Sequence, residues 1–290
     1  MGYRMLVADV DGTLMARNGH VSPRVRAAIR AALASGTLVV LATGRWFRSA
    51  QPIARELGLD LPIILHNGAL VKDLVTGEVL DHCHLPRAMA DEAIAIIRRH
   101  GLQPIVYENV FEGELLVTGP AELDGEQAAR YLATKTEHLR RVPLDELRLT
   151  ADPIQLAVAD SADRADALVA ELARGPWQTV TSMSLAVPDA RFVEVLSPGC
   201  SKATAMARQA TAHGVPLSEV MAVGDNYNDL DMIEAAGLGV AMGNAPPAVR
   251  ARADVVVPTV EEDGLAVAIE RYVLAATGRS SLGVAEGSRG

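Results

Sequence analysis

The chain has 290 residues, of which 49% are hydrophobic, 22% are charged and only 3% are aromatic, and its formal net charge is −9. This composition supplies a large core, so we expect two domains or one large α/β unit. The acidic balance, without a long basic stripe, argues against nucleic acid and anionic membranes as partners, and an anionic substrate would need locally concentrated cations.

The two cysteines carry a further expectation about the compartment. Cys83 and Cys200 lie far apart in the sequence and show no paired spacing, which suits a reducing compartment and argues against a disulfide framework. No signal peptide precedes the first expected strand, and no apolar run reaches the ~18 residues of a membrane span. We therefore expect a cytoplasmic protein with no membrane partner; the sequence carries no signal of its oligomeric state.

The first expected strand ends in a pair of carboxylates. An apolar run leads into Asp9 and Asp11, and Gly12 then breaks the strand. Alternation along a strand puts both carboxylates on one face. Two like charges at this spacing raise a pKa or require a cation, so the pair suits Mg2+, a proton transfer, or both. A solvated strand end or a helix N-cap is the alternative without chemistry.

The next part of the chain alternates helices and strands. We expect a helix from Pro23 to Gly36 with Ser22 as its cap, a strand over 38–42, a helix over about 47–57, a strand over 62–65, and a hairpin formed by 69–71 and 78–80. Continuous apolar runs are typical of strands that are buried on both faces of a parallel sheet. The order predicts right-handed crossovers and a doubly wound α/β fold with a Rossmann-like parallel sheet.

From about His82 the pattern changes. We expect helices over 88–100 and 162–173 and strands over 105–108, 114–118, 154–159, 180–183 and 192–196. Several of these strands are short and half polar, which is typical of an α+β sheet covered by helices on one face. The charged segment 122–149 is expected to form one helix plus loops. We therefore predict a second unit over 82–196, inserted into the parallel domain.

The parallel pattern returns after Ser197. We expect a helix from Lys202 to about Ala212, a strand over 220–223, a helix over 229–235, strands over 239–242 and 253–257, and a helix over 265–276. This assigns 1–81 and 197–277 to one domain. Residues 278–290, rich in Ser, Gly and Arg, are predicted to form a disordered tail.

Polar groups follow several of these strands. In an open α/β sheet the ligand site lies beyond the carboxyl ends of the strands, so these groups are expected to converge. Thr43 offers a hydroxyl and Gly44 a backbone N–H for phosphate oxygens, although Thr-Gly-Arg is also an ordinary strand-to-helix turn. Lys202 opens a helix, where the macrodipole disfavours a cation, which implies an anionic neighbour unless the lysine is simply solvated.

A group of polar side chains follows the strand over 220–223. Asp225, Asn228 and Asp229 cluster there. A lone acidic residue in such a turn is usually a helix cap, but three oxygen-bearing groups suit a cation site.

These residues also resemble a known family. Asp9-Val10-Asp11-Gly12-Thr13-Leu14 matches the D-x-D-G-T-[LV] signature of the haloacid-dehalogenase-like (HAD) superfamily, most of whose members are Mg2+-dependent phosphatases. Thr43, Lys202 and the run over 224–229 match its remaining motifs in order. The insertion, together with the segments 67–69, 242–245 and 262–264, is similar to the Cof-like (type IIB) branch, which has an α/β cap. The resemblance covers nearly the whole chain.

The resemblance implies a role for each motif residue. Asp9 would attack phosphorus and form an aspartyl-phosphate, and Asp11 would protonate the leaving alkoxide and then accept a proton from water. Mg2+ would be held by Asp9, the backbone carbonyl of Asp11 and Asp225, with Asp229 in support. The groups implied in binding the transferring phosphate are Gly12, Thr43, Gly44, Lys202 and Asn228.

The resemblance also implies a reaction and a division of labour. We expect a Mg2+-dependent phosphatase acting on a small phosphorylated substrate, such as a sugar phosphate or a phosphorylated cofactor, with the cap setting selectivity. A phosphomutase of the same superfamily and a phospholigand-binding regulator are the alternatives.

Four other features have less support. The segment 81–84 contains two histidines, one cysteine and one aspartate, but a solvated hairpin between domains is favoured over zinc. Gly237, Gly239 and Gly243 have the wrong spacing for a dinucleotide fingerprint. Trp46 is expected in the core and His66 as a packed or capping residue.

Overall fold

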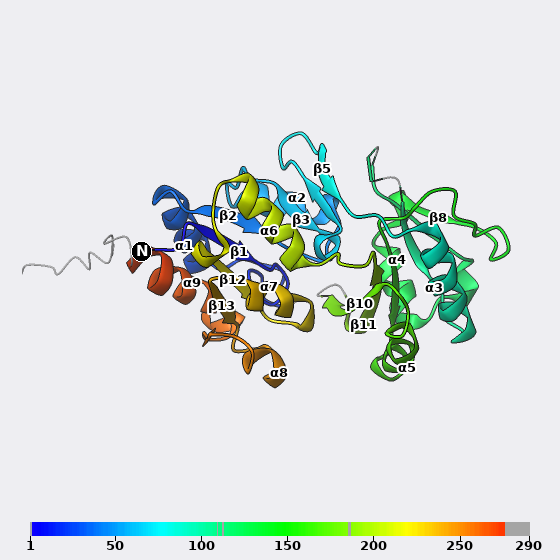
Figure 1. The fold of residues 1–290 in the computed structure, drawn as a ribbon. Coiled ribbons are helices and arrows are strands. Elements are labelled where there is room, and N and C mark those ends of the chain that lie inside the picture. The colour runs from blue at the N-terminus through cyan, green and yellow to red at the C-terminus, as the bar shows by residue number, and fades with distance from the viewer. Residues whose placement is uncertain (1, 109, 112, 185–186, 276–290) are drawn as a thin grey trace, which may run out of the picture.

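The structure is a computed structural model that describes residues 2–108, 110–111, 113–184 and 187–275 (Figure 1). The expected tail over 278–290 and the last residue of the expected helix over 265–276 lie outside the described residues. Figure 1 shows two lobes joined by two connecting segments. Within the described residues, no helix has the length and apolar character needed to cross a bilayer.

One lobe is built on a five-stranded parallel sheet. The strands are β1 (Met5–Ala8), β2 (Leu38–Leu41), β12 (Val220–Gly224), β13 (Leu238–Ala241) and β14 (Val255–Val256), in the order β14-β13-β12-β1-β2. β1 therefore lies between β2 and β12, with Ala8 in register with Leu41 on one side and Val223 on the other. This arrangement brings the segments that follow these three strands together at one edge of the sheet.

Helices cover both faces of this sheet. They are α1 (Pro23–Ala34), α2 (Phe47–Glu56), α6 (Lys202–Ala212), α7 (Leu230–Ala235), α8 (Pro247–Arg250) and α9 (Gly264–Ala268), the last continuing as a π-helix over Ile269–Leu274. Side chains of β1 alternate between the faces: Leu6 packs in the same apolar cluster as residues of α1 and α9, and Val7 in the cluster that contains residues of α6 and α7. A doubly wound sheet, as predicted, is the result.

A three-stranded antiparallel sheet extends this lobe toward the other one. It consists of β3 (Ile63–Leu65), β4 (Leu70–Lys72) and β5 (Val79–His82). An isolated parallel bridge from Ala42 to Ile64 connects it to the end of β2. The predicted hairpin is therefore present.

The inserted lobe is a cap built on a six-stranded mixed sheet. Its strands, in the order β10-β11-β9-β6-β7-β8, are β6 (Ile105–Glu108), β7 (Leu115–Thr118), β8 (Leu139–Arg141), β9 (Gln155–Asp160), β10 (Gln178–Ser184) and β11 (Val187–Leu196). Helices α3 (Arg87–Arg99) and α5 (Ala162–Leu172) pack in one apolar cluster with the sheet, whereas α4 (Glu126–Ala133) contributes Ala128 to another, which contains Ala159 and Phe192.

Two short elements differ from the sequence-based expectation. The segment 122–149 contains α4, as expected, but also β8, which pairs in parallel with β7. β8 has the sequence Leu-Arg-Arg and lies at the edge of the sheet, so it carries none of the apolar alternation that identifies a strand. α8, which is one turn long, was likewise not expected.

The two cysteines lie where the chain passes between the lobes. Cys83 directly follows β5 and Cys200 directly precedes the N-cap of α6, so each lies in one of the two segments that join the lobes. Both are free thiols.

Candidate active site

The site is built where β1, β2 and β12 end. Asp9 continues β1, and its backbone N–H donates to the carbonyl of Val223 at 3.0 Å. Gly12 turns the chain with a φ of +90°, and a Cβ at this position would lie 2.3 Å from Asp225 Oδ2. Glycine is therefore required here both for the backbone conformation and for the close approach of the two loops.

A buried lysine joins two carboxylates. Lys202 Nζ lies 2.6 Å from Asp9 Oδ1 and 2.6 Å from Asp229 Oδ1, and its side chain has no exposed surface. Burial lowers the pKa of Lys202, but the charges of Asp229 and Asp9 outweigh this and raise it above its usual value. The lysine at the start of α6 thus has the anionic neighbours that its position in the sequence implied.

The third carboxylate, Asp225, is held by the loops around it. Thr13 Oγ1 donates to Asp225 Oδ1 at 3.0 Å, and Asn244 Nδ2 donates to Asp225 Oδ2 at 3.2 Å and to the Gly12 carbonyl at 2.9 Å. Sequence analysis assigned no role to Thr13 or Asn244, although both lie in the quoted motif segments.

Asp229 is already fully engaged. Its Oδ2 accepts from the backbone N–H groups of Asp225 at 2.9 Å and Asn226 at 3.0 Å, and its Oδ1 binds Lys202. This leaves Asp9 and Asp225 as the carboxylates with more capacity to bind a ligand.

The cluster suits a metal ion. Asp9, Asp225 and Asp229 are buried, and one oxygen from each lies within 4.8 Å of the others. Burial raises the pKa of Asp9 to about 7, and it also raises the pKa of Asp225, with the neighbouring carboxylates adding to both shifts. Hard oxygen donors with uncompensated negative charge are the groups that a divalent cation binds, so these residues could hold one.

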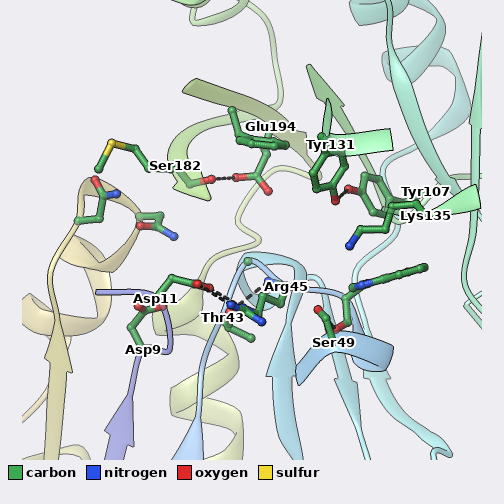
Figure 2. A pocket seen from close by; sticks show the side chains of 16 residues that line it. Asp9, Asp11, Thr43, Arg45, Ser49, Tyr107, Tyr131, Lys135, Ser182 and Glu194 are labelled. Carbon is green, nitrogen blue, oxygen red and sulfur yellow. Dashed lines mark hydrogen bonds and ion pairs between the residues drawn. The ribbon is translucent and has the colours of Figure 1, made fainter. Parts of the chain in front are cut away.

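Asp11 faces a different partner. Arg45 Nε lies 2.6 Å from Asp11 Oδ2, and Arg45 Nη2 lies 2.6 Å from Asp11 Oδ1, which makes the pair bidentate (Figure 2). Burial lowers the pKa of Arg45, but the hydrogen bonds and charge of Asp11 raise it overall. From the sequence, Arg45 was assigned only as the last residue of a turn. Its position directly after Thr43 and Gly44 is the signal that could have placed it in the site.

The phosphate-binding candidates line the same pocket. Thr43 is buried, and its Oγ1 accepts from the Arg45 backbone N–H at 3.1 Å. Gly44 and Asn228 also line the pocket, and Asn228 Nδ2 donates to Asn67 Oδ1 at 2.9 Å. The structure therefore gathers Asp9, Asp11, Gly12, Thr43, Gly44, Lys202, Asp225, Asn228 and Asp229 around one site.

The cap supplies the opposite wall of the pocket. Ser182 Oγ donates to Glu194 Oε2 at 2.8 Å, and the hydroxyl oxygens of Tyr107 and Tyr131 are 2.6 Å apart (Figure 2). Burial raises the pKa of Glu194. Lys135 also lines this wall. None of these five residues was singled out from the sequence, because nothing in their local pattern identifies them.

His66 and Trp46, which had less support from the sequence, are both buried. His66 is fully buried, with Nε2 3.3 Å from Glu114 Oε1, as expected of a packed histidine. Trp46 is buried as expected but also lines the pocket, with Lys135 Nζ 5.0 Å from its ring centroid.

The histidines of segment 81–84 contact each other. His82 Nδ1 and His84 Nδ1 are 2.9 Å apart, and both rings pack on Phe111. Asp81 pairs with Arg208. Within the part of the chain that the structure describes, no third metal-ligating residue joins the two histidines.

Comparisons with known proteins agree with this arrangement. A family model described as haloacid dehalogenase-like hydrolase matches residues 6–269. The chain is 29% identical to the 5-amino-6-(5-phospho-D-ribitylamino)uracil phosphatase YcsE of Bacillus subtilis, over 93% of this chain and 96% of the relative. It is 28% identical to the pyridoxal phosphate phosphatase YbhA of Escherichia coli, over 94% of this chain and 100% of the relative.

A solved structure shows the same architecture. A sugar phosphatase of HAD subclass IIB superposes with a TM-score of 0.74 at 24% identity, covering 92% of this chain and 98% of that one. At this identity the likeness concerns the fold, a parallel core sheet with an inserted cap. The chain belongs to the haloacid dehalogenase-like hydrolase family and is a phosphatase of that family.

Proposed function

We propose that this phosphatase is Mg2+-dependent and hydrolyses small phosphorylated metabolites through an aspartyl-phosphate on Asp9. The observation that carries the proposal is the buried Lys202, shared by Asp9 and Asp229 beside Asp225. The buried Lys202 holds Asp9 in place directly after β1. The three carboxylates carry more negative charge than one lysine can neutralise, so a divalent cation can also bind.

Asp9 acts as the nucleophile in this proposal. Lys202 binds its Oδ1 and orients the carboxylate, and the other oxygen attacks phosphorus. When bound by Asp9, the backbone carbonyl of Asp11 and Asp225, with Asp229 in support, Mg2+ would offset the repulsion between the carboxylate and the phosphate dianion. Asp229 contributes by holding Lys202 and the turn that carries Asp225.

Asp11 acts as the general acid and then as the general base. Its bidentate contact with Arg45 points the carboxyl group into the pocket. An incoming phosphate competes with Asp11 for Arg45, which frees the Asp11 carboxyl group to face the leaving group. Arg45 is thus a positioning residue that can also share the charge of the phosphate.

The transferring oxygens are bound by donors from several loops. We assign this role to the Thr43 hydroxyl, the Gly44 N–H group, the Lys202 ammonium and the Asn228 amide. Gly12, whose own N–H donates to the Met15 carbonyl at 2.9 Å, would contribute by letting the first loop approach them closely. They come from loops that the parallel sheet holds in register, so they are preorganised for the transition state.

The domain division supports a selective cap. We place the core at 1–81 and 197–277 and the cap at 82–196. Glu194, Ser182 and Lys135 then face the part of the substrate that is not phosphate, and closure adds their contacts to a small sugar phosphate or phosphorylated cofactor. The two relatives named above are nearly equally similar to this chain in sequence, yet their names give two different substrates. We therefore assign substrate selectivity to local contacts such as those of Glu194, Ser182 and Lys135. The cytoplasmic location stays a prediction.

Release of inorganic phosphate tests the proposal. The purified protein should release phosphate from some members of a panel of sugar phosphates, nucleotides and phosphorylated cofactors, with Mg2+ required. Rapid acid quenching should trap a phosphoryl group on the wild type and none on Asp9→Asn. Substrate isomerisation without phosphate release would instead identify a mutase, and phosphate release in excess chelator would contradict the metal requirement.

A further inference from the structure

The pocket contains a second cation besides Arg45, and this one comes from the cap. Lys135 lies in the segment that follows α4 and lines the same pocket as Asp9 and Thr43, and Figure 2 shows its side chain pointing into that pocket. Arg45 is occupied by its bidentate contact with Asp11. In the part of the chain that the structure describes, no carboxylate forms an ion pair with Lys135.

Two aromatic rings hold the Lys135 ammonium. Its Nζ lies 5.0 Å from the ring centroid of Trp46 and 5.2 Å from that of Tyr131. Trp46 belongs to the core, as the residue before α2, whereas Tyr131 belongs to α4 of the cap. Cation–π contacts orient an ammonium group without neutralising its charge. The lysine is therefore preorganised, and its charge stays available to a ligand.

The rings are themselves fixed by packing. Trp46 is 7% exposed. The hydroxyl oxygen of Tyr131 lies 2.6 Å from that of Tyr107, and its ring packs edge-on against Phe192 with the centroids 4.8 Å apart. The ammonium thus rests on a rigid part of the pocket wall, which distinguishes it from a lysine that moves freely in solvent.

The electrostatic surroundings of Lys135 favour an anion. Burial lowers the pKa of Lys135, and the charge of Arg45 lowers it further. Both effects mean that the protonated lysine is stabilised poorly by the protein alone. An anionic group of a ligand would supply the missing partner. In a chain with a net charge of −9, this is the locally concentrated positive charge that an anionic substrate needs.

The transferred phosphate has partners of its own. The donors that we assign to it, among them Thr43, Gly44 and Lys202, all come from loops of the core. Lys135 comes from the cap, and its contact with the core is the ring of Trp46, two residues beyond Gly44. The Lys135 ammonium is therefore left for another group of the substrate.

We propose that Lys135 binds a second anionic group of the substrate, a carboxylate or a further phosphate, so that the enzyme prefers phosphomonoesters that carry one. The ammonium donates to the oxygens of this group while Trp46 and Tyr131 hold it in place. Figure 2 shows Glu194 on the other side of Tyr131, where its carboxyl group would accept from hydroxyl groups of the substrate. The preference in turnover rests on the proposed phosphatase function, whereas the preference in binding does not.

Binding to a protein that does not turn over tests the proposal first. Two pairs of esters differ mainly in the second anionic group: 3-phosphoglycerate with glycerol 3-phosphate of matching configuration, and fructose 1,6-bisphosphate with fructose 6-phosphate. Calorimetry with Asp9→Asn in the presence of Mg2+ should give roughly tenfold tighter binding of the first member in at least one pair. The pair that responds identifies the second group as carboxylate or phosphate. Equal binding within both pairs, or no binding of any ester, would overturn the proposal.

Substitution of the lysine in the same Asp9→Asn protein tests its part. Lys135→Met keeps a chain that packs on aromatic rings but removes the charge, so the preference should fall about tenfold while the affinity for glycerol 3-phosphate or fructose 6-phosphate changes little. Lys135→Arg should retain most of the preference. Arg148→Met removes an exposed positive charge from the cap and, as the control, should leave the preference unchanged. Equal weakening of both members of a pair by Lys135→Met would mean that Lys135 binds the phosphate they share, and would refute the proposal.

Turnover separates this proposal from the proposed function. With Asp9 intact, kcat/KM for phosphate release should show the same preference and lose it in Lys135→Met. If no ester releases phosphate but the binding preference still depends on Lys135, the hydrolysis is wrong and the anion site stands. Phosphate release with no preference within either pair would refute the anion site alone.

Discussion

Asp9 and Asp11, the two carboxylates that follow β1, have different partners, so substituting each should affect turnover in a different way. Asp11 is bound by Arg45 and not by Lys202. Asp11→Asn should keep the nucleophile but lose the proton donor, lowering kcat on alkyl phosphates by roughly 10²–10⁴-fold. The defect should shrink with aryl phosphates, whose leaving groups need little protonation. Steady-state kinetics on matched alkyl and aryl esters measures the difference.

Asp9→Asn is the companion variant in this comparison. It removes the nucleophile, so activity should fall to background on both ester types. An equal loss for Asp11→Asn on the two ester types would count against its role in proton transfer.

Asp225 offers a direct test of the metal site. Its carboxylate is buried beside Asp9 and has few protein donors of its own. Asp225→Asn removes one negative charge from the cluster, so the Mg2+ concentration for half-maximal activity should rise at least tenfold. Titration of Mg2+ after chelation measures it. Asp60→Asn, an exposed carboxylate, is the matched control and should titrate like the wild type.

The residues of the site were predictable to different degrees. Asp9, Thr43, Lys202 and Asp225 follow or precede recognisable strands and helices, and parallel strands bring such positions to one edge of a sheet. Their individual roles remain predictions. The partner of Asp11 was not predictable, because Arg45 lies 34 positions away in a turn that has an ordinary explanation.

At the scale of elements, the turn after β1 should tolerate no side chain at its glycine. Gly12→Ala would place a Cβ against Asp225 Oδ2 and force an unfavourable φ, so activity and Mg2+ affinity should both fall strongly. Gly19→Ala isolates the backbone cost, because Gly19 has a φ of +76° with nothing near a Cβ; it should lose at most about 1–2 kcal/mol of stability. Thermal unfolding and Mg2+ titration of the two variants compare them, and equal Mg2+ affinity would contradict the proposed contact.

Most elements could be located from the sequence because their apolar periodicity is strong. The strand over 105–108 was expected with the bounds that the structure has, and α1 begins at the predicted Ser22 cap. β8 was missed because three half-polar residues at a sheet edge obtain their strand conformation from pairing with β7, a tertiary contact.

At the scale of the whole molecule, Glu114 links the cap to the core. Its carboxylate accepts from the backbone N–H of Phe47 at 2.9 Å and of Arg48 at 3.4 Å, at the start of α2, and it contacts His66. Burial raises the pKa of Glu114, but His66, the Phe47 amide and Lys72 lower it overall. Glu114, a residue of the inserted lobe, therefore binds the N-terminal N–H groups of a helix in the core.

Loss of this contact should favour the open arrangement. Glu114→Ala leaves buried donors unpaired, at a cost of about 1–3 kcal/mol, so KM for metabolite substrates should rise several-fold while a small aryl phosphate is affected less. Small-angle scattering should report a larger radius of gyration. Glu122→Ala, an exposed cap residue, provides the control; if both variants retain wild-type KM and dimensions, Glu114 does not hold the cap closed.

The position of β1 between β2 and β12 has a consequence for synthesis of the chain. Thr13 and Asp225, whose side chains are hydrogen-bonded, are 212 positions apart. At about 5–20 residues per second, a ribosome needs roughly 10–40 s between them. All strands of the cap sheet emerge in that interval, so the cap can fold while β1 still has one unpaired edge. The catalytic centre can then assemble only after every strand of the cap sheet has been made.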